Sequence, residues 1–416
     1  MTNEPRARAR SPFTSRLLRP AVGAAAVLAA TVAFAAPAVA HRQSDPADPL
    51  TTVTGHVRGN GDIFVTPTSA AGTGNGAQIV DKQGRTVWFH QAAPGTVDAD
   101  FRTQTLNGKP VLTFWEGTGF GGLSNGTDYI YSDHYKLIAK VHAGDGLTTD
   151  GHEFLLGEHG TAYVLSYDTA TADLTSIGGP SDQTVIDGIV QKIDIRTGKV
   201  LFSWNSADHV PYGQSEQPLP ASASTPWDWF HVNAVHVDTD GKLLIDARDT
   251  WTAYKVDPRN GHIVWQLGGK ASSFSLVAAD GQSLNNAGKI FAWQHDINGH
   301  GHGIYTVFDN ESAGTGNTGQ DASSELDHSR VVTISLNTRQ RRATLVQSDD
   351  EPDGQLAPSQ GNGQRLRNGD VFIGWGALNA VSEFNRHGGI VWDARFPTGT
   401  NTYRAYLLPW KGDRRS

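Results

Sequence analysis

The sequence predicts an all-β protein, and more narrowly a six-bladed β-propeller of four-stranded blades. Three observations support this fold class. The chain has 416 residues, of which 47 are glycine, as expected for many short strands joined by tight turns. A hairpin pattern recurs six times along it. No second linker divides the chain, and a single domain of this size is best explained by repeats arranged around an axis.

The first 40 residues have the pattern of a secretory signal peptide. Five arginines precede an apolar run from Ala21 to Ala35, and a small-residue site ends at Ala40. The run is too short and alanine-rich for a membrane span of about 20 apolar residues, so an uncleaved anchor is the weaker reading. We therefore expect cleavage after Ala40, a linker over 41–52 and one propeller domain over 53–416. The mature protein is expected to be secreted or otherwise extracytoplasmic, without stable membrane association.

Charge and cysteine content exclude several functions. Removal of residues 1–40 takes away five arginines and one glutamate, so the net charge changes from −8 to −12. No basic block remains, and nucleic acid is therefore not an expected partner. The chain has no cysteine, which rules out disulfides, thiolate metal sites and cysteine nucleophiles.

The repeat consists of a strand, a short turn and a second strand, with apolar and polar residues alternating along both strands. Four copies carry glycine in the turn, where a residue with positive φ is needed. Two weaker copies lack it. The six predicted hairpins cover residues 79–88, 130–141, 191–202, 254–265, 332–346 and 382–392.

A second type of strand pair lies between these hairpins and completes each blade. Clear examples begin at Gly160, Gly241 and Asn368. Two hairpins per repeat give four strands per blade. Because the hairpins begin 50 to 78 residues apart, we expect six blades, or seven if a long interval conceals one more.

Three histidines occupy equivalent positions in successive repeats. His152, His231 and His295 each lie just before an inner hairpin. Inner strands line the central channel of a propeller, so these side chains are expected to converge at the channel mouth. Arg248 follows the second of these inner strands and could bind an anion at the same rim. The alternative is that all four stabilise the corners of the blades.

Taken in order, these motifs resemble the core of the bacterial arylsulfotransferases. The segment His231-Val232-Asn233 is similar to the family's His-x-Asn motif, and a strand ending at Arg248 and the hairpin of Trp265-Gln266-Leu267-Gly268 follow it. Gln294-His295-Asp296 resembles the Gln-His motif that carries the key histidine of the next blade. Gly151-His152-Glu153-Phe154 resembles an earlier blade of the family.

The similarity extends from roughly residue 70 to residue 410, and segments 363–370 and 404–406 resemble the C-terminal blades. Better-studied members carry an extra N-terminal β domain and a disulfide. This chain has no room for the first and no cysteine for the second, so it resembles a shorter branch of the family.

The resemblance implies transfer of a sulfuryl group from an aryl sulfate to a phenol, without a nucleotide donor. It implies that His295 is the nucleophile that carries the group. His152, His231 and Arg248 would hold the sulfate oxygens and the reacting phenolic oxygen, and Asn233 would donate a hydrogen bond there. Small aryl sulfates and phenols are then the expected partners. No cofactor and no metal is required, and the oligomeric state is left open.

These residue types suit the reaction on chemical grounds. A neutral imidazole is a competent nucleophile near neutral pH. The moving group spreads negative charge over its oxygens, which fixed cations and N–H donors stabilise, and a histidine can protonate the leaving phenolate. Four tryptophans near the motifs could form walls for an aromatic acceptor, although packing between blades is the commoner role: Trp227, Trp229, Trp251 and Trp293.

Two other functions remain open. His295, Asp296, His300 and His302 could supply imidazole and carboxylate ligands for the metal of a propeller hydrolase, although the turn at 298–301 would direct the last two histidines away from the first. The other alternative is a non-catalytic binding propeller. The polar channel mouth counts against it, since a scaffold has no need of such a cluster.

Overall fold

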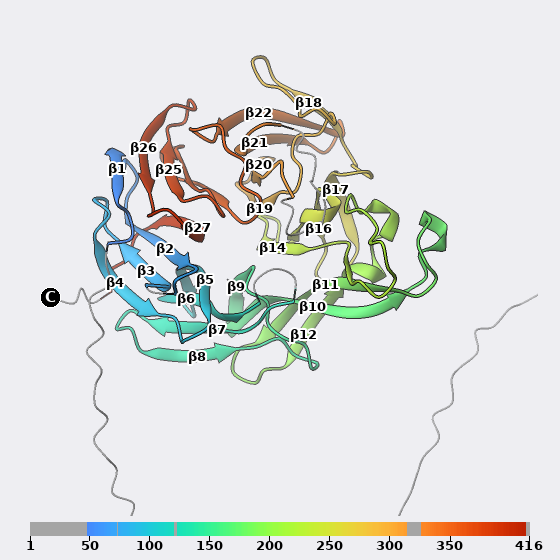
Figure 1. Ribbon diagram of the computed structural model, residues 1–416, viewed down its shortest axis with the longest axis horizontal. Helices are drawn as coiled ribbons and strands as arrows, with labels where there is room; N and C mark the ends of the chain where they lie inside the picture. The colour runs from blue at the N-terminus through green and yellow to red at the C-terminus, as the bar shows by residue number, and fades with distance from the viewer. Residues whose placement is uncertain (1–47, 73, 120–122, 314–325, 413–416) are drawn as a thin grey trace, which may run out of the picture. The chain divides into compact units, whose positions relative to one another are not determined.

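The computed structural model describes residues 48–72, 74–119, 123–313 and 326–412, and these residues form six sheets in a ring (Figure 1). The six-bladed propeller predicted from the sequence is confirmed. The predicted signal peptide lies outside the described residues. Within the described ranges, helices are limited to five 3-10 segments of three residues each, and none is long and apolar enough to cross a lipid bilayer.

Blades 2, 3 and 4 are continuous along the chain, with their strands in order from the axis outward. Blade 2 consists of β5 (Val97–Leu106), β6 (Lys109–Thr118), β7 (Asn125–Ser132) and β8 (Leu137–Val141). Blade 3 consists of β9 (Phe154–Leu156), β10 (Thr161–Ala172), β11 (Gln183–Asp194) and β12 (Val200–Asn205). Blade 4 consists of β14 (Val232–Val237), β15 (Leu243–Ala247), β16 (Thr252–Val256) and β17 (Ile263–Gly268).

Blades 5 and 6 each carry a fifth, outer strand. Blade 5 consists of β19 (His295–Gly299), β20 (Ile304–Asp309), β21 (Arg330–Asn337) and β22 (Arg342–Asp350), with β18 (Ser275–Ala278) parallel to β22. Blade 6 consists of β23 (Asn362–Arg365), β24 (Val371–Gly374), β25 (Ala380–Phe384) and β26 (Ile390–Arg395), with β1 (Thr52–Gly55) antiparallel to β26.

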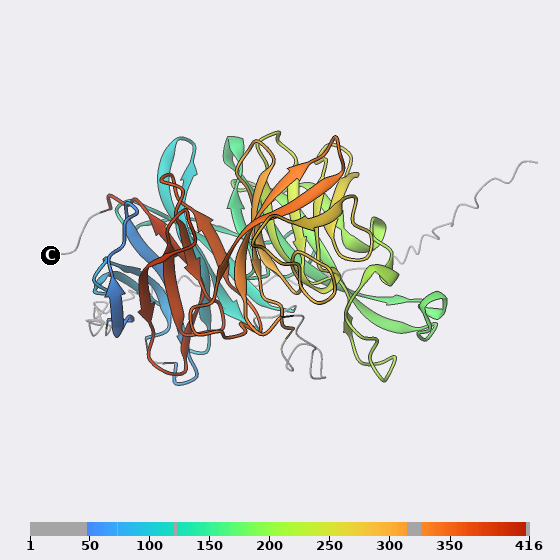
Figure 2. The ribbon, with the colours of Figure 1, turned by 90° about the horizontal axis from the view of Figure 1, so that it is seen from above.

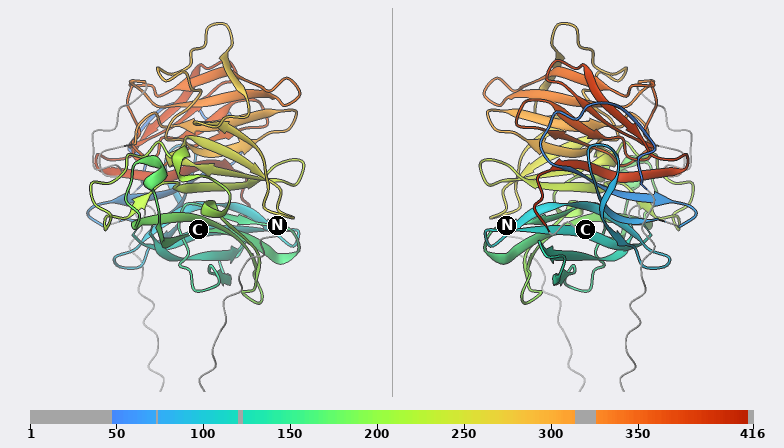
Figure 3. Two further views of the ribbon diagram at one scale, coloured as in Figure 1. Left: turned by 90° about the vertical axis from the view of Figure 1, so that its right-hand side faces the viewer. Right: turned by 90° about the vertical axis from the view of Figure 1, so that its left-hand side faces the viewer.

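Blade 1 closes the ring with strands from both ends of the described chain. Its order is β27 (Thr400–Leu408), β2 (Asp62–Ser69), β3 (Gly76–Val80) and β4 (Thr86–Gln91), with β27 at the axis. The right panel of Figure 3 shows the blue N-terminal strands beside the red C-terminal ones. Leu50 is buried in the apolar core between blades 1 and 6, and the described residues begin within the predicted linker over 41–52.

All six predicted hairpins form the third and fourth strands of a blade. Each has a β-bulge, which lies close to the turn in every hairpin except that of β21 and β22, and each turn has one residue with positive φ. In four hairpins this residue is the predicted glycine. In the other two it is Tyr135 (φ 55°) and Arg341 (φ 49°). The two weaker copies therefore form the turn with a non-glycine residue whose backbone is strained at positive φ.

Replacing Arg341 with glycine tests this strain. We expect Arg341→Gly to raise the free energy of unfolding by about 0.5–1 kcal/mol, because glycine adopts positive φ without a steric penalty. Arg342→Gly is the matched control, since Arg342 has no positive φ, and it should lower stability by a similar amount. Chemical denaturation measures both. Equal losses in the two variants would contradict the explanation.

Candidate functional site

Three buried histidines meet at one end of the innermost strands of blades 3, 4 and 5. His152 precedes β9, His231 precedes β14, and His295 is the first residue of β19. The ring centroid of His152 lies 5.1 Å from that of His231 and 6.5 Å from that of His295. The structure thus brings together the three histidines that the sequence placed at equivalent positions.

Asn310 fixes the tautomer of His295. The Asn310 amide group donates to the carbonyl oxygens of Ala357 (2.9 Å) and Gln360 (3.0 Å), so its Oδ1 faces His295 as an acceptor. Nδ1 of His295 lies 2.7 Å from this oxygen and must therefore carry the proton. The lone pair is left on Nε2, which accepts the backbone N–H of Gln360 at 3.2 Å.

Burial holds the pKa of His295 well below its usual range, and the electrostatic effects of Arg248 and His152 lower it further. His295 is therefore neutral near neutral pH. A neutral ring with its lone pair on a defined nitrogen is the form of histidine that acts as a nucleophile.

Carboxylates hold the other two histidines. Nδ1 of His231 lies 2.5 Å from Asp228, and Nδ1 of His152 lies 2.5 Å from Asp150. Each carboxylate accepts the Nδ1 proton. Burial tends to lower the pKa of His231, but the charge and hydrogen bond of Asp228 outweigh it and raise that pKa above its usual value. Burial alone would raise the pKa of Asp150, but His152 and Ser124 bring it below its usual value.

A projection of blade 3 supports the Asp228–His231 pair. The far ends of β10 and β11 extend beyond the ring (Figure 2), and β13 (Trp227–Asp228) pairs with β11 there in parallel, with Asp228 opposite Ile186. Trp229 donates to Asp187 of β11 at 2.9 Å. The backbone of His231 has a φ of 52°. His231 is thus held by contacts from outside the ring.

Arg248 lies next to the histidines in a 3-10 segment after β15. Its guanidinium is buried, donates to Asp249 (2.7 Å) and to the carbonyl of Ala313 (2.5 Å), and lies 5.2 Å from the ring centre of Trp293. Its Nε has no hydrogen-bond partner among the described residues. The structure therefore places a fixed cation within electrostatic reach of His295 and His231.

Asn233 is placed differently from the sequence expectation. Its Nδ2 donates to the carbonyl of Gln294 at 2.7 Å, so the amide joins blade 4 to the residue before His295. The structure does not direct this N–H toward the three rings. Asn233 instead fixes the backbone that carries His295.

The four tryptophans of the sequence analysis are all buried. Trp227 and Trp229 belong to the apolar core between blades 3 and 4. Trp251 and Trp293 pack edge to face at 5.3 Å, and Trp293 also supports Arg248. Packing accounts for all four, and walls for a substrate ring do not follow from their positions.

Sequence reasoning gave no role to several residues of the site. Asn310 and Gln360 contact His295, and the rings of Tyr167 and Tyr403 lie 6.2 Å and 5.9 Å from that of His152. Asp150 and Asp228 also escaped notice. A local signal for these two exists, because each accepts the backbone N–H of its histidine two or three residues on, as aspartates do in tight turns.

A buried ion-pair network fills the axis behind the histidines. Arg404 of β27 lies 2.7 Å from Glu153, 3.3 Å from Asp100 and 3.7 Å from Asp296, and Arg102 contacts Asp100 and Glu153. The two arginines hold the pKa of Glu153 at about 2 despite its burial. Glu153 and Asp296 directly follow His152 and His295, so this network fixes the segments that carry the site.

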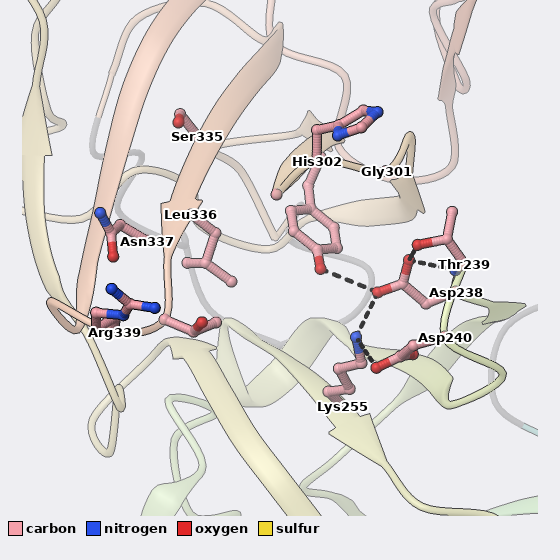
Figure 4. A pocket seen from close by; sticks show the side chains of 13 residues that line it. Asp238, Thr239, Asp240, Lys255, Gly301, His302, Ser335, Leu336, Asn337 and Arg339 are labelled. Carbon is pink, nitrogen blue, oxygen red and sulfur yellow. Dashed lines mark hydrogen bonds and ion pairs between the residues drawn. The ribbon is translucent and has the colours of Figure 1, made fainter.

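The proposed metal ligands do not gather at one point. His302 lines a cavity of about 640 Å³ at the opposite end of β14 and β19, beside Asp238, Lys255 and Tyr305 (Figure 4). Nε2 of His300 contacts Thr306. Among the described residues, no group of three metal-binding side chains with ligand atoms within 4.8 Å of one another includes His295, His300 or His302. Of the four expected ligands, Asp296 alone belongs to such a group among the described residues, with Glu153 and His236, and Arg404 lies within ion-pair distance of both carboxylates.

Comparisons with known proteins find one matching family. The sequence pattern of the arylsulfotransferase (ASST) family matches residues 102–397. No curated protein matches the chain. Solved structures that resemble it include a Bacteroides caccae protein of unknown function (11% identity, 83% of this chain and 98% of that chain, TM-score 0.46). Another is the Pan2 WD40 domain of Neurospora crassa (10% identity, 85% and 88%, TM-score 0.36).

Removing the charge of Asp228 tests the electrostatics of the site. Because that carboxylate raises the pKa of His231, we expect Asp228→Asn to lower this pKa by about one unit or more. NMR titration of the imidazole, assigned with a His231→Gln variant, measures the shift. Asp168→Asn, at an exposed position of β10, should leave the pKa of His231 unchanged. An unaltered pKa in Asp228→Asn would refute the assignment.

Proposed function

This chain belongs to the arylsulfotransferase family, and from that premise we propose that it is a secreted, nucleotide-independent arylsulfotransferase with a sulfohistidine intermediate. One observation supports the proposal most strongly. His295 is a neutral imidazole with its lone pair on Nε2, and it lies beside two carboxylate-held histidines and a buried arginine.

In the first half-reaction, Nε2 of His295 attacks the sulfur of an aryl sulfate. The S–N bond forms while the bond from sulfur to the phenolic oxygen breaks. His231 gives its Nε2 proton to the leaving phenolate. Arg248 and His152 stabilise the charge on the sulfuryl oxygens. His295 keeps its Nδ1 proton throughout and donates it to Oδ1 of Asn310.

In the second half-reaction, an acceptor phenol takes the place of the product. His231, now neutral, removes the phenol proton, and the phenolic oxygen attacks sulfur as the S–N bond breaks. The new aryl sulfate leaves, and both histidines return to their starting forms. The cycle consumes no nucleotide, metal or other cofactor, and its partners are small aryl sulfates and phenols.

The environments of the two carboxylates support this division of roles. The side chain of Asp228 is 20% exposed, whereas that of Asp150 is 1% exposed. The Asp228–His231 pair is therefore the more accessible of the two, as suits the residue that gives a proton to the leaving phenol and takes one from the entering phenol. The enclosed Asp150–His152 pair suits a fixed hydrogen-bond donor, which is most effective when it does not reorganise during the reaction.

Chromophore release from 4-nitrophenyl sulfate tests the reaction. We expect release that requires an acceptor phenol, persists with a chelator and falls at least about 1,000-fold in His295→Ala, because the nucleophile is lost. His302→Ala is the control and should keep full activity. Release without phenol that the chelator abolishes would instead indicate a metal hydrolase. No release with any aryl sulfate would favour a binding role.

Variants of Asn310 test the tautomer. Asn310→Ala should reduce kcat on the order of 100-fold or more, because Nδ1 is no longer fixed as the protonated nitrogen. Asn310→Asp should keep that proton in place but raise the pKa of His295 through its charge. The acidic limb of its pH–rate profile should then move to higher pH. An equal loss at every pH in both variants would mean that Asn310 acts only in folding.

A further inference from the structure

A second cluster of titratable side chains lies at the joint between blades 1 and 2, apart from the histidine site. His90 comes from β4 of blade 1, and Asp98 and Glu116 come from β5 and β6 of blade 2. Asp98 and Glu116 are directly opposite each other in the strand register, so their side chains share one face of the sheet. One ligand atom from each of the three residues lies within 4.8 Å of the others.

The negative charge of this cluster is poorly compensated. The Asp98 side chain is fully buried, and its Oδ1 has no hydrogen-bond partner among the described residues. Oδ2 accepts the backbone N–H of Ala77 at 2.8 Å and lies 3.1 Å from Nδ1 of His90. A buried carboxylate without a full counter-charge is costly.

The absence of an arginine sets this cluster apart. Among the described residues, two other groups of three have metal-binding side chains at similar spacing. Arg102 and Arg404 contact Glu153 in one of them, and Arg248 contacts Asp249 in the other. A bound cation would meet a fixed positive charge in both. Among the described residues, neither Asp98 nor Glu116 forms an ion pair with an arginine or lysine, and Asp98 lies 3.1 Å from His90.

We propose that His90, Asp98 and Glu116 bind a divalent transition-metal ion such as Zn²⁺ or Mn²⁺. One imidazole and two carboxylates are ligands that such ions accept. The 3.1 Å between Nδ1 of His90 and Oδ2 of Asp98 suits two adjacent ligands that each lie about 2.1 Å from one ion. The His90 ring is held in place by Phe114, whose centroid lies 4.7 Å away.

This metal joins two blades and takes no part in sulfuryl transfer. It connects blade 1, where both ends of the described chain meet, to blade 2. The chain has no cysteine and so cannot form a disulfide. A metal bound by residues of both blades would cross-link them instead. Binding to the folded state alone raises the melting temperature, so the proposal stands or falls separately from the proposed enzymatic function.

Thermal unfolding of the full chain, first treated with chelator, tests the site. Saturating Zn²⁺ or Mn²⁺ should raise Tm by about 2–5 °C, and calorimetric titration should show one ion bound per chain. Glu116→Gln should abolish both effects. This variant keeps an acceptor for the backbone N–H of Ala93, which Glu116 accepts at 3.1 Å, and should leave chromophore release from 4-nitrophenyl sulfate unchanged.

Two further variants make the result decisive. Glu158→Gln, an exposed position, is the matched control and should keep the metal-dependent rise in Tm. His90→Gln should lose it, independently of Glu116. A wild-type chain whose Tm does not respond to either ion would overturn the proposal. So would a rise that persists in both Glu116→Gln and His90→Gln, because the ion would then bind elsewhere.

Discussion

The buried guanidinium of Arg404 connects five of the six blades. It lies on the innermost strand of blade 1 and contacts Asp100 of blade 2, Glu153 beside blade 3, the carbonyl of Asn233 in blade 4 and Asp296 of blade 5. Removing one partner from such a buried ionic network is strongly destabilising, on the order of 3–5 kcal/mol. Two of these partners are sequence neighbours of the histidines, so the interaction that holds the inner strands around the axis also sets the spacing of the site.

The histidines of the site differ in chemistry because their Nδ1 atoms have different hydrogen-bond partners. An amide oxygen holds the Nδ1 proton of His295 without adding charge, so burial and Arg248 keep that ring neutral. A carboxylate holds the Nδ1 proton of His231 and raises its pKa. The two pKa values therefore move in opposite directions within one small volume, which is how a buried site can hold a nucleophile and an acid together.

Local patterns were predictable from the sequence, and contacts between distant segments were not. The six hairpins and the blade number follow from turn glycines and alternation, and the meeting of the histidines follows from their equivalent positions in the repeats. The positive φ of Tyr135 and Arg341 was not predictable, because neither is glycine and tertiary context imposes this conformation on them. The axial network was not predictable because its partners are far apart in the sequence: Arg404 and Glu153 are 251 positions apart. Asn310 was not predictable for the same reason, because it orients His295 only through its contacts with Ala357 and Gln360.

The ring itself positions the groups of the site. Closure rests on the pairing of β27 with β2 over the length of blade 1, and β1 covers the outer edge of blade 6. His152, His231 and His295 lie on inner strands or on the loops that lead into them, whereas Arg248 and Asn310 lie on the connections that follow the second strands of blades 4 and 5. The inner strands are fixed by pairing on one side and by the axial charges on the other. The projecting ends of β10 and β11 add a contact from outside the ring: through β13 they hold Asp228, whose charge raises the pKa of His231.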